Sequence, residues 1–249
     1  MTILLLGDLT GRSRVALRML TFELENRGHE VLILPTALIS NTLNLGRAAK
    51  ADTTDYLLES LATWEALGLS YDLVYIGYVT GLAQAEKLCE VADAARAKGI
   101  PVVVDPILGD NGRRYNSVTT EQAEAMARLI RHADVITPNL TEACLLAGQP
   151  YETADADALL DALRMGHVSV LITSAGDAVA GRDAQTGERF RIPFERVPGE
   201  HWGTGDRFCA LLLDGLTRKL PLAQATKRAS DGVYAALSGK NPANPIDEV

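Results

Sequence analysis

Short apolar runs alternate with longer segments of helical period along most of the chain. The runs are rich in Val, Ile and Leu and nearly continuous, which is typical of strands covered on both faces. We expect such strands at Thr2–Leu6, Glu30–Leu34, Leu73–Ile76, Val102–Val104, Val135–Ile136 and Val168–Ile172. The helices between them are expected at Arg14–Arg27, Thr54–Leu67, Ala83–Lys98, Thr120–His132 and Ala154–Met165. This alternation predicts an α/β fold, a mostly parallel sheet with helices on both faces.

The pattern changes after residue 175. Ala178–Arg182 and Arg189–Phe194 are separated by a turn around Gly187 and predict a hairpin. Two closing helices are expected at Asp206–Lys219 and Leu222–Leu237. No internal repeat or linker interrupts the sequence, so one domain over residues 1–249 is the simplest prediction.

Composition and charge narrow the class of function. Lys and Arg number 24 against 32 Asp and Glu, a formal charge of −8, so neither nucleic acid nor a membrane surface is an expected partner. No stretch approaches the ~20 apolar residues of a membrane span. Three cysteines without metal-ligand spacing indicate reduced thiols in a cytoplasmic protein. The four histidines are scattered and predict no metal cluster.

Ligands of open α/β sheets bind beyond the carboxyl ends of the strands. Unusual segments follow several strands, and the most informative is Gly203-Thr204-Gly205-Asp206, which opens an apolar helix. Glycines let the backbone approach a ligand, and the N–H groups of a first helical turn bind anions. Asp206 could accept the proton of a substrate hydroxyl, although Asp is also a common helix cap.

Two common nucleotide sites are absent from the sequence. The first strand is followed by Gly7-Asp8-Leu9-Thr10-Gly11, which is not GxGxxG, and no GxxxxGK[ST] occurs. The later Gly203–Asp206 segment is therefore the main candidate for a phosphate site.

Several segments of this chain resemble segments of one known protein family, and they occur in the same order. Gly203–Asp206 with its helix resembles the signature of ribokinase-like kinases, and VVVDPILGDNGRRY (Val102–Tyr115) resembles pyridoxal and pyridoxamine kinases. Asp134–Ala143 resembles the nucleotide and metal segment of that family. Leu34–Asn41 and Gly77-Tyr78 are similar to its substrate-side segments.

This resemblance implies a ribokinase-like three-layer fold and an enzyme that uses ATP and Mg²⁺. The implied reaction is phosphorylation of the 5′-hydroxymethyl group of pyridoxal, pyridoxamine or pyridoxine, so the expected partner is a small B6 vitamer. A monovalent cation such as K⁺ is a further candidate cofactor. Relatives commonly form homodimers, and we expect one here.

The resemblance also assigns roles to individual residues. Asp206 would be the catalytic base, and Gly203, Thr204 and Gly205 would form the anion hole. Asp105 and Glu142 would hold Mg²⁺ and, with Thr137, Asn139 and Thr173, the ATP phosphates. The substrate pocket would be lined by Asp8, Thr10, Thr36, Ser40, Asn41, Tyr78 and Tyr115, the last on a lid over 110–115.

Several of these residues also fit purely structural roles. Glu142 stands at capping-box spacing from Asn139. Asp105 also fits as the end of a strand before Pro106, and Tyr78 as a packing residue. The Gly109–Gly112 segment has the composition of a turn.

The sequence departs from the family at two places. Family members usually carry a His after the Ser-Asn at residues 40–41, whereas Thr42, Leu43 and Asn44 follow here. Many also place a Ser in the loop that here runs from Gly7 to Gly11, where Asp8 and Thr10 could substitute for it. Two alternatives therefore stay open: a hydroxymethylpyrimidine kinase on the same scaffold, and a non-catalytic protein that binds a vitamer. The Gly109–Gly112 segment favours the vitamin B6 branch, and the intact Gly203–Asp206 segment favours an enzyme.

Overall fold

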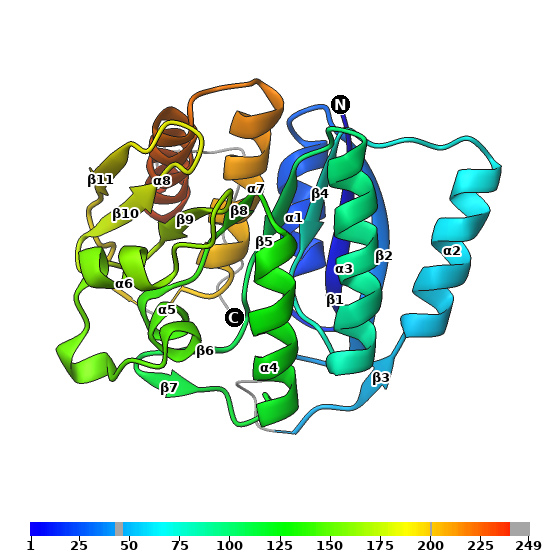
Figure 1. Cartoon of the computed structure of the whole chain (residues 1–249), viewed down its shortest axis with the longest axis horizontal. Helices are drawn as coiled ribbons and strands as arrows, with labels where there is room; N and C mark the ends of the chain where they lie inside the picture. Colours follow the sequence, from blue (N-terminus) through cyan, green and yellow to red (C-terminus); the bar gives the residue numbers. More distant parts are fainter. Residues whose placement is uncertain (43–46, 200, 240–249) are drawn as a thin grey trace.

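A computed structural model describes residues 1–42, 47–199 and 201–239, and over these residues the chain forms a nine-stranded sheet with helices on both faces (Figure 1). The strand order is β11-β10-β9-β8-β5-β4-β1-β2-β3. Neighbours from β9 to β2 pair in parallel, and β3, β10 and β11 pair antiparallel at the two edges. The predicted fold class is confirmed.

The sheet contains β1 (Thr2–Thr10), β2 (Glu30–Ile39), β3 (Lys50–Asp52), β4 (Leu73–Ile76), β5 (Val102–Val104), β8 (Val135–Ile136), β9 (Ser169–Ile172), β10 (Ala178–Arg182) and β11 (Arg189–Pro193). A separate small hairpin consists of β6 (Gly109–Asp110) and β7 (Arg113–Arg114). The helices are α1 (Leu17–Glu25), α2 (Thr54–Ala66), α3 (Leu82–Ala97), α4 (Thr120–Leu129), α5 (Leu140–Ala147), α6 (Ala156–Ala162), α7 (Thr204–Thr217) and α8 (Leu222–Leu237), with short 3₁₀ turns at Ile130–His132 and Tyr151–Thr153.

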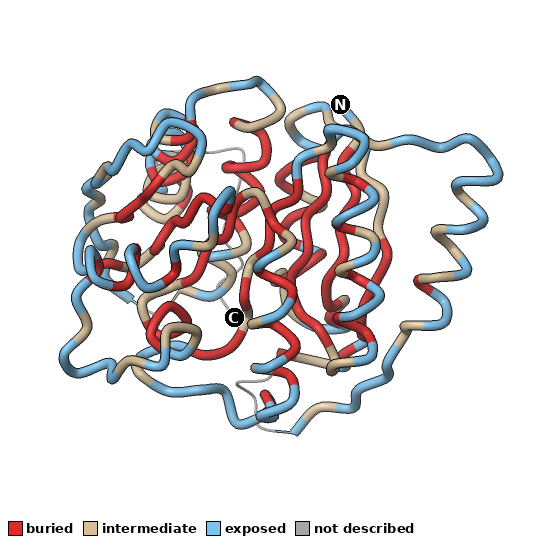
Figure 2. The backbone as a smooth tube through the Cα atoms, in the orientation of Figure 1, coloured by how far each residue is buried: buried red, intermediate tan, exposed pale blue. Residues whose placement is uncertain are grey.

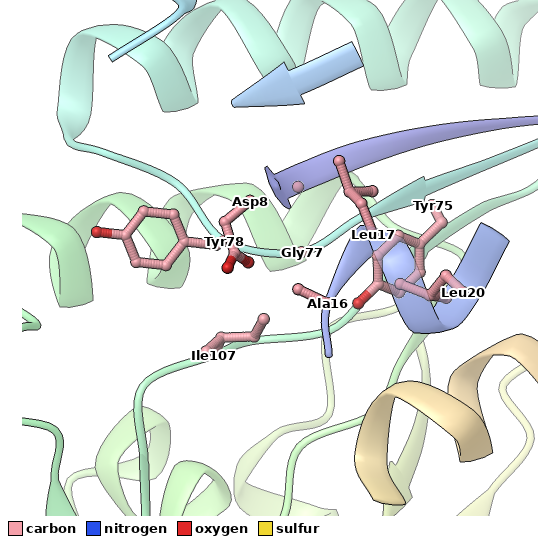
Figure 3. A pocket seen from close by; sticks show the side chains of 9 residues that line it. Asp8, Ala16, Leu17, Leu20, Tyr75, Gly77, Tyr78 and Ile107 are labelled. Carbon is pink, nitrogen blue, oxygen red and sulfur yellow. The ribbon is translucent and has the colours of Figure 1, made fainter. Parts of the chain in front are cut away.

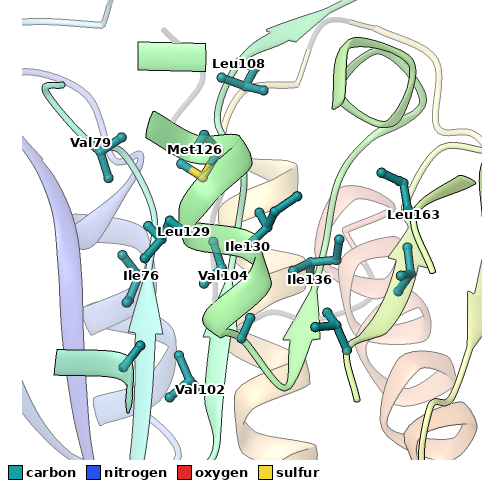
Figure 4. Packing of buried hydrophobic residues seen from close by; sticks show 14 of the residues in the cluster. Ile76, Val79, Val102, Val104, Leu108, Met126, Leu129, Ile130, Ile136 and Leu163 are labelled. Atoms are coloured by element: carbon teal, nitrogen blue, oxygen red, sulfur yellow. The ribbon is translucent and has the colours of Figure 1, made fainter. Parts of the chain in front are cut away.

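Two apolar cores lie on the two faces of the sheet, which explains the continuous apolarity of its strands (Figure 2). Along β1, Ile3 and Leu5 belong to the core under α1, α7 and α8, whereas Leu4 and Leu6 belong to the core under α3 to α6. Figure 4 shows the second core, where the α4 region lies over β4, β5 and β8. Burial on both faces fixes the positions of the strands, and therefore also the position of the edge where the parallel strands end.

The structure adds details that the apolar pattern did not predict. β1 and β2 continue past their apolar runs to Thr10 and Ile39, and the edge strand β3 has no apolar signal. α1 begins at Leu17 rather than Arg14, because the preceding chain takes positive φ values at Ser13 (76°) and Ala16 (51°). Among the described residues, no helix combines the length and the apolarity needed to cross a bilayer.

Candidate active site

The segments predicted to carry chemistry meet at the carboxyl edge of the parallel strands. β1 supplies Asp8, the residue after β5 is Asp105, the residue after β8 is Thr137, and the first turn of α7 supplies Asp206. The hydroxyl of Thr137 donates a 2.8 Å hydrogen bond to Oδ1 of Asp105. The charges of Asp105 and Asp8 both act on the carboxyl group of Asp206, so these side chains form one electrostatic cluster.

The N-terminus of α7 has the geometry of an anion site. Gly203 is the N-cap residue and takes the left-handed conformation (φ 73°), and Thr204, Gly205 and Asp206 form the first turn. The first N–H groups of a helix have no acceptor within the helix, so they are available to an anion. A Cβ built on Gly205 would meet nothing within 4 Å, so there is open space at this turn.

Asp206 faces the loop that precedes α1 rather than the apolar interior. Its Oδ2 accepts a 2.8 Å hydrogen bond from the backbone N–H of Ala16. Burial raises the pKa of Asp206, the hydrogen bond from Ala16 lowers it, and the charges of Asp105 and Asp8 raise it, with the balance at about 7. A carboxyl group with such a pKa changes between acid and base near neutral pH, as a general base requires.

Asp105 is held by hydroxyl groups from two other strands. Besides Thr137, the phenol of Tyr75 donates a 3.2 Å hydrogen bond to Oδ2 of Asp105, and Cys209 from α7 lies 3.5 Å from the Thr137 hydroxyl. Desolvation raises the pKa of Asp105, while these hydrogen bonds lower it. Tyr75 was not predicted from the sequence, because it is a single phenol within the apolar run of β4.

Glu142 serves as a cap and as a buried member of the same cluster. Asn139 and Glu142 form a complete capping box, with Asn139 N–H donating to Oε2 (2.8 Å), while Leu108 N–H donates to Oε1 (3.0 Å). Burial and then the charge of Asp105 raise the pKa of Glu142 well above its usual range. The structural role predicted for Glu142 is therefore present, and it does not exclude a role at a ligand.

Asp105 and Glu142 suit a divalent cation that is shared with a phosphate. The charge of Asp105 raises the pKa of Glu142, and a cation bound near both carboxylates would relieve that repulsion. Among the described residues, no group of three or more His, Cys, Asp or Glu side chains could hold a metal ion. Two carboxylates completed by water and phosphate oxygens are a common arrangement for Mg²⁺, so these residues fit it.

A narrow pocket lies beside this cluster (Figure 3). Its lining residues are Gly7, Asp8, Ala16, Leu17, Leu20, Tyr75, Gly77, Tyr78 and Ile107. Asp8 and Tyr78 were among the predicted substrate residues. The phenol oxygen of Tyr78 accepts hydrogen bonds from Gln122 Nε2 (2.8 Å) and Lys50 Nζ (3.3 Å), so the phenol is already engaged.

Four other predicted substrate residues support the loops around this pocket. Thr36 is fully buried, and its hydroxyl donates to the carbonyl of Tyr78 (2.6 Å). The Thr10 hydroxyl donates to the Ser13 carbonyl (3.5 Å). Ser40 donates to Oδ1 of Asn41, whose amide donates to nearby carbonyls. None of the four is among the lining residues of the pocket, and Leu43 and Asn44 lie outside the described residues.

Tyr115 and Thr173 complete the set of predicted residues. The β6–β7 hairpin is fixed to α5, because Asn139 Nδ2 donates to the Gly109 carbonyl and Gly112 N–H to the Thr141 hydroxyl. Tyr115 follows this hairpin, and burial and then Glu142 and further carboxylates raise the pKa of its phenol, which places it beside the cluster. Thr173 N–H donates to the carbonyl of Pro138 (2.9 Å), next to Thr137 and Asn139.

Sequence comparison with known proteins points to one kinase family. Residues 33–246 match the sequence model of the phosphomethylpyrimidine kinase family. A pyridoxine/pyridoxal/pyridoxamine kinase of Bordetella bronchiseptica is 30% identical over 84% of this chain and 79% of its own length. The first curated relatives differ in length, and the chain spans as little as 54% of one from Caenorhabditis elegans.

Solved structures agree with the sequence comparison. A protein of Bacteroides thetaiotaomicron assigned to the phosphomethylpyrimidine kinases, solved with pyridoxal, is 31% identical with a TM-score of 0.88, over 96% of this chain and 87% of that one. The pyridoxal kinase of Leishmania donovani, solved with ADP and pyridoxamine, is 25% identical with a TM-score of 0.77, over 96% of this chain and 86% of that one.

Proposed function

Because the chain belongs to the phosphomethylpyrimidine kinase family and has pyridoxal kinases among its relatives, we propose that it phosphorylates a B6 vitamer. The γ-phosphoryl group of ATP would be transferred to the 5′-hydroxymethyl group of pyridoxal, pyridoxamine or pyridoxine. The observation that carries this proposal is the position of Asp206. Its carboxylate lies in the first turn of α7, next to the pocket residue Ala16 and to free backbone N–H groups.

The proposed mechanism is direct in-line transfer. Asp206 accepts the proton of the attacking hydroxyl group, and the N–H groups of Thr204, Gly205 and Asp206 stabilise the charge on the transferring phosphoryl group. Positioning and charge stabilisation supply most of the catalysis, and no covalent enzyme intermediate is needed.

The nucleotide would lie over the β5, β8 and β9 ends of the sheet. Asp105 and Glu142 would hold Mg²⁺, which supplies positive charge to the β- and γ-phosphates when bound. Thr137 contacts Asp105, Asn139 contacts Glu142, and Thr173 contacts the carbonyl of Pro138 between them. These three residues would contact the phosphates, with the hairpin and Tyr115 as a lid. Assembly as a homodimer and a monovalent-cation requirement stay predictions from the family resemblance.

A panel of acceptor alcohols tests the proposal. ADP release is measured with pyridoxal, pyridoxamine, pyridoxine and hydroxymethylpyrimidine, each with ATP and Mg²⁺. We expect transfer to at least one B6 vitamer, with a kcat/KM above that for hydroxymethylpyrimidine. Absence of phosphorylated product with all four alcohols would reject the proposed kinase.

Hydroxymethylpyrimidine is the second candidate acceptor, because the matched family is named for phosphomethylpyrimidine kinases. The phosphate chemistry at Asp206 would be the same, so only the pocket decides between the two. A higher kcat/KM for the pyrimidine would assign the chain to this second function. Vitamer binding in calorimetry without any ADP release would instead indicate a non-catalytic binding protein.

A further inference from the structure

The carboxylate of Asp8 lies in the pocket, and no cation of the described part of the chain is found in contact with it. Asp8 is only 9% exposed, and its carboxyl oxygens lie toward the space among Tyr78, Gly77 and Ile107 (Figure 3). Across residues 1–42, 47–199 and 201–239, the interactions found for this group are its own backbone N–H and the more distant charge of Lys50. A buried carboxylate with so few partners is costly, which indicates that a ligand completes its surroundings.

A register shift between β1 and β2 places Asp8 at this position. Gly7 pairs with Pro35, but Asp8 pairs with Ala37, so Thr36 is an extra residue in β2. Such bulges are frequent next to active sites, where they redirect side chains. The Thr36 hydroxyl donates to the carbonyl of Tyr78, so the same bulge fixes Tyr78 relative to Asp8.

Tyr78 contributes an aromatic ring to this part of the pocket rather than a free hydroxyl. Gln122 and Lys50 both donate to its phenol oxygen, which points away from Asp8 in Figure 3. The Lys50 ammonium lies 5.6 Å from the ring centroid. A flat heteroaromatic ring can pack against such a side chain, and a positive charge on that ring strengthens the contact.

The pocket is connected directly to the proposed catalytic base. Ala16 lines the pocket, and its N–H donates to Asp206. An alcohol whose hydroxyl reaches Asp206 would therefore have its ring near Tyr78 and Asp8. Lys50, whose charge acts on Asp8, already donates hydrogen bonds to the Tyr78 phenol and to the Ser117 carbonyl.

We propose that Asp8 is a specificity-determining residue, which selects a heteroaromatic primary alcohol with a protonated ring nitrogen by pairing with that N–H⁺ group. This inference rests on the proposed function, because it takes the pocket to be the acceptor site. A charge-assisted hydrogen bond of this kind separates a basic ring from a neutral ring of the same shape by about tenfold or more in affinity.

The test compares two ligands of the same shape. Calorimetry on the full chain measures Kd for pyridoxine and for its carbocyclic analogue, in which C–H replaces the ring nitrogen. The wild-type protein should bind pyridoxine at least about tenfold more tightly than the analogue. Asp8→Asn and Asp8→Ser should each reduce that ratio to below about threefold. Asp93→Asn, on the exposed side of α3 beside His132, is the matched control and should keep the wild-type ratio.

Two results would overturn the role of Asp8: equal affinities of the wild-type protein for both ligands, or an unchanged ratio in the Asp8 variants. The wild-type comparison applies even if both variants fail to fold. ADP release with pyridoxine is measured on the same samples. Transfer with an unchanged ratio rejects this inference and leaves the kinase proposal intact, whereas an Asp8-dependent ratio without transfer supports the binding role and rejects the kinase.

Discussion

Asp206 is subject to opposing influences that together place its pKa at about 7. Burial and the neighbouring carboxylates favour the protonated form, and the N–H group of Ala16 favours the ionised form. The backbone of Ala16 takes a φ of 51° to make this contact, a conformation that residues other than Gly rarely adopt. This one residue pair therefore connects the loop before α1 to the proposed catalytic base beside the pocket.

The pH dependence of turnover should report the ionisation of Asp206. A general base must be unprotonated, so kcat/KM should fall about tenfold per pH unit below about 7 and level off above it. The measurement is a pH–rate profile at saturating ATP and Mg²⁺. A flat profile between pH 5.5 and 8 would contradict the assignment of the base.

Replacing Asp206 by Asn tests the same role by removing the proton acceptor. We expect kcat to fall by about 10²–10⁴-fold, because this is the usual contribution of a positioned general base. The amide keeps the shape of the side chain, so the Kd for ATP in calorimetry should change less than about threefold. Near-normal turnover of Asp206→Asn would show that another group takes the proton.

At the scale of the element, the start of α7 combines two glycines with different roles. Gly203 has a left-handed backbone, and a Cβ there would lie 3.2 Å from the Arg14 carbonyl oxygen. Gly205 has no such constraint, and a Cβ there would meet nothing within 4 Å. Arg207, two residues after Gly205, is buried and pairs with Glu23 of α1 at 2.9 Å, which anchors this turn.

Alanine at these two glycines should separate stability from activity. Gly203→Ala should lower the free energy of unfolding by about 1–2 kcal/mol through left-handed strain. Gly205→Ala should raise it by about 0.5–1 kcal/mol through helix propensity, yet lower kcat, because its methyl group occupies the space proposed for the phosphoryl group. Urea unfolding and the kinetic assay check both effects. Full activity of Gly205→Ala would place the phosphoryl group elsewhere.

At the scale of the whole molecule, the C-terminal edge of the parallel strands concentrates carboxyl groups. Asp8 has a pKa of about 6 and Asp206 of about 7, and the pKa values of Asp105 and Glu142 are also raised. Folding thus brings together carboxyl groups that resist ionisation. Ionising these groups costs free energy, and a divalent cation or a cationic ring bound at this edge would offset that cost.

These raised pKa values predict how stability depends on pH and on Mg²⁺. The stability that Asp8 and Asp206 contribute is fully present below about pH 4 and is lost as the pH rises through about 6 and 7. The Tm should therefore fall between pH 5 and pH 8, by about 2–4 °C for each kcal/mol lost. Added Mg²⁺ should recover more of the Tm at pH 8 than at pH 5. Calorimetry with EDTA as the control measures these changes in Tm. If Mg²⁺ raises the Tm of Asp105→Asn as much as that of the wild-type protein, Asp105 is excluded from the cation site.

Part of the molecule follows from local sequence. The apolar runs predicted the parallel strands, because burial on both faces requires continuous apolarity in every such strand. The hairpin of β10 and β11 and the helix after Gly203 were predicted from turn residues and helical period. Lys50 was not found, because its strand β3 is exposed, short and without an apolar signal.

The sequence by itself determined the fold class, and it predicted the edge of the sheet where a ligand is expected and the segment proposed as the anion site, because burial pattern and helix starts are encoded within a few residues. Only the tertiary structure decided that Ala16 contacts Asp206, that Tyr75 contacts Asp105 and that Lys50 contacts Tyr78. Each of these contacts joins distant segments, and their meeting depends on strand order, register and loop path, which local periodicity does not encode.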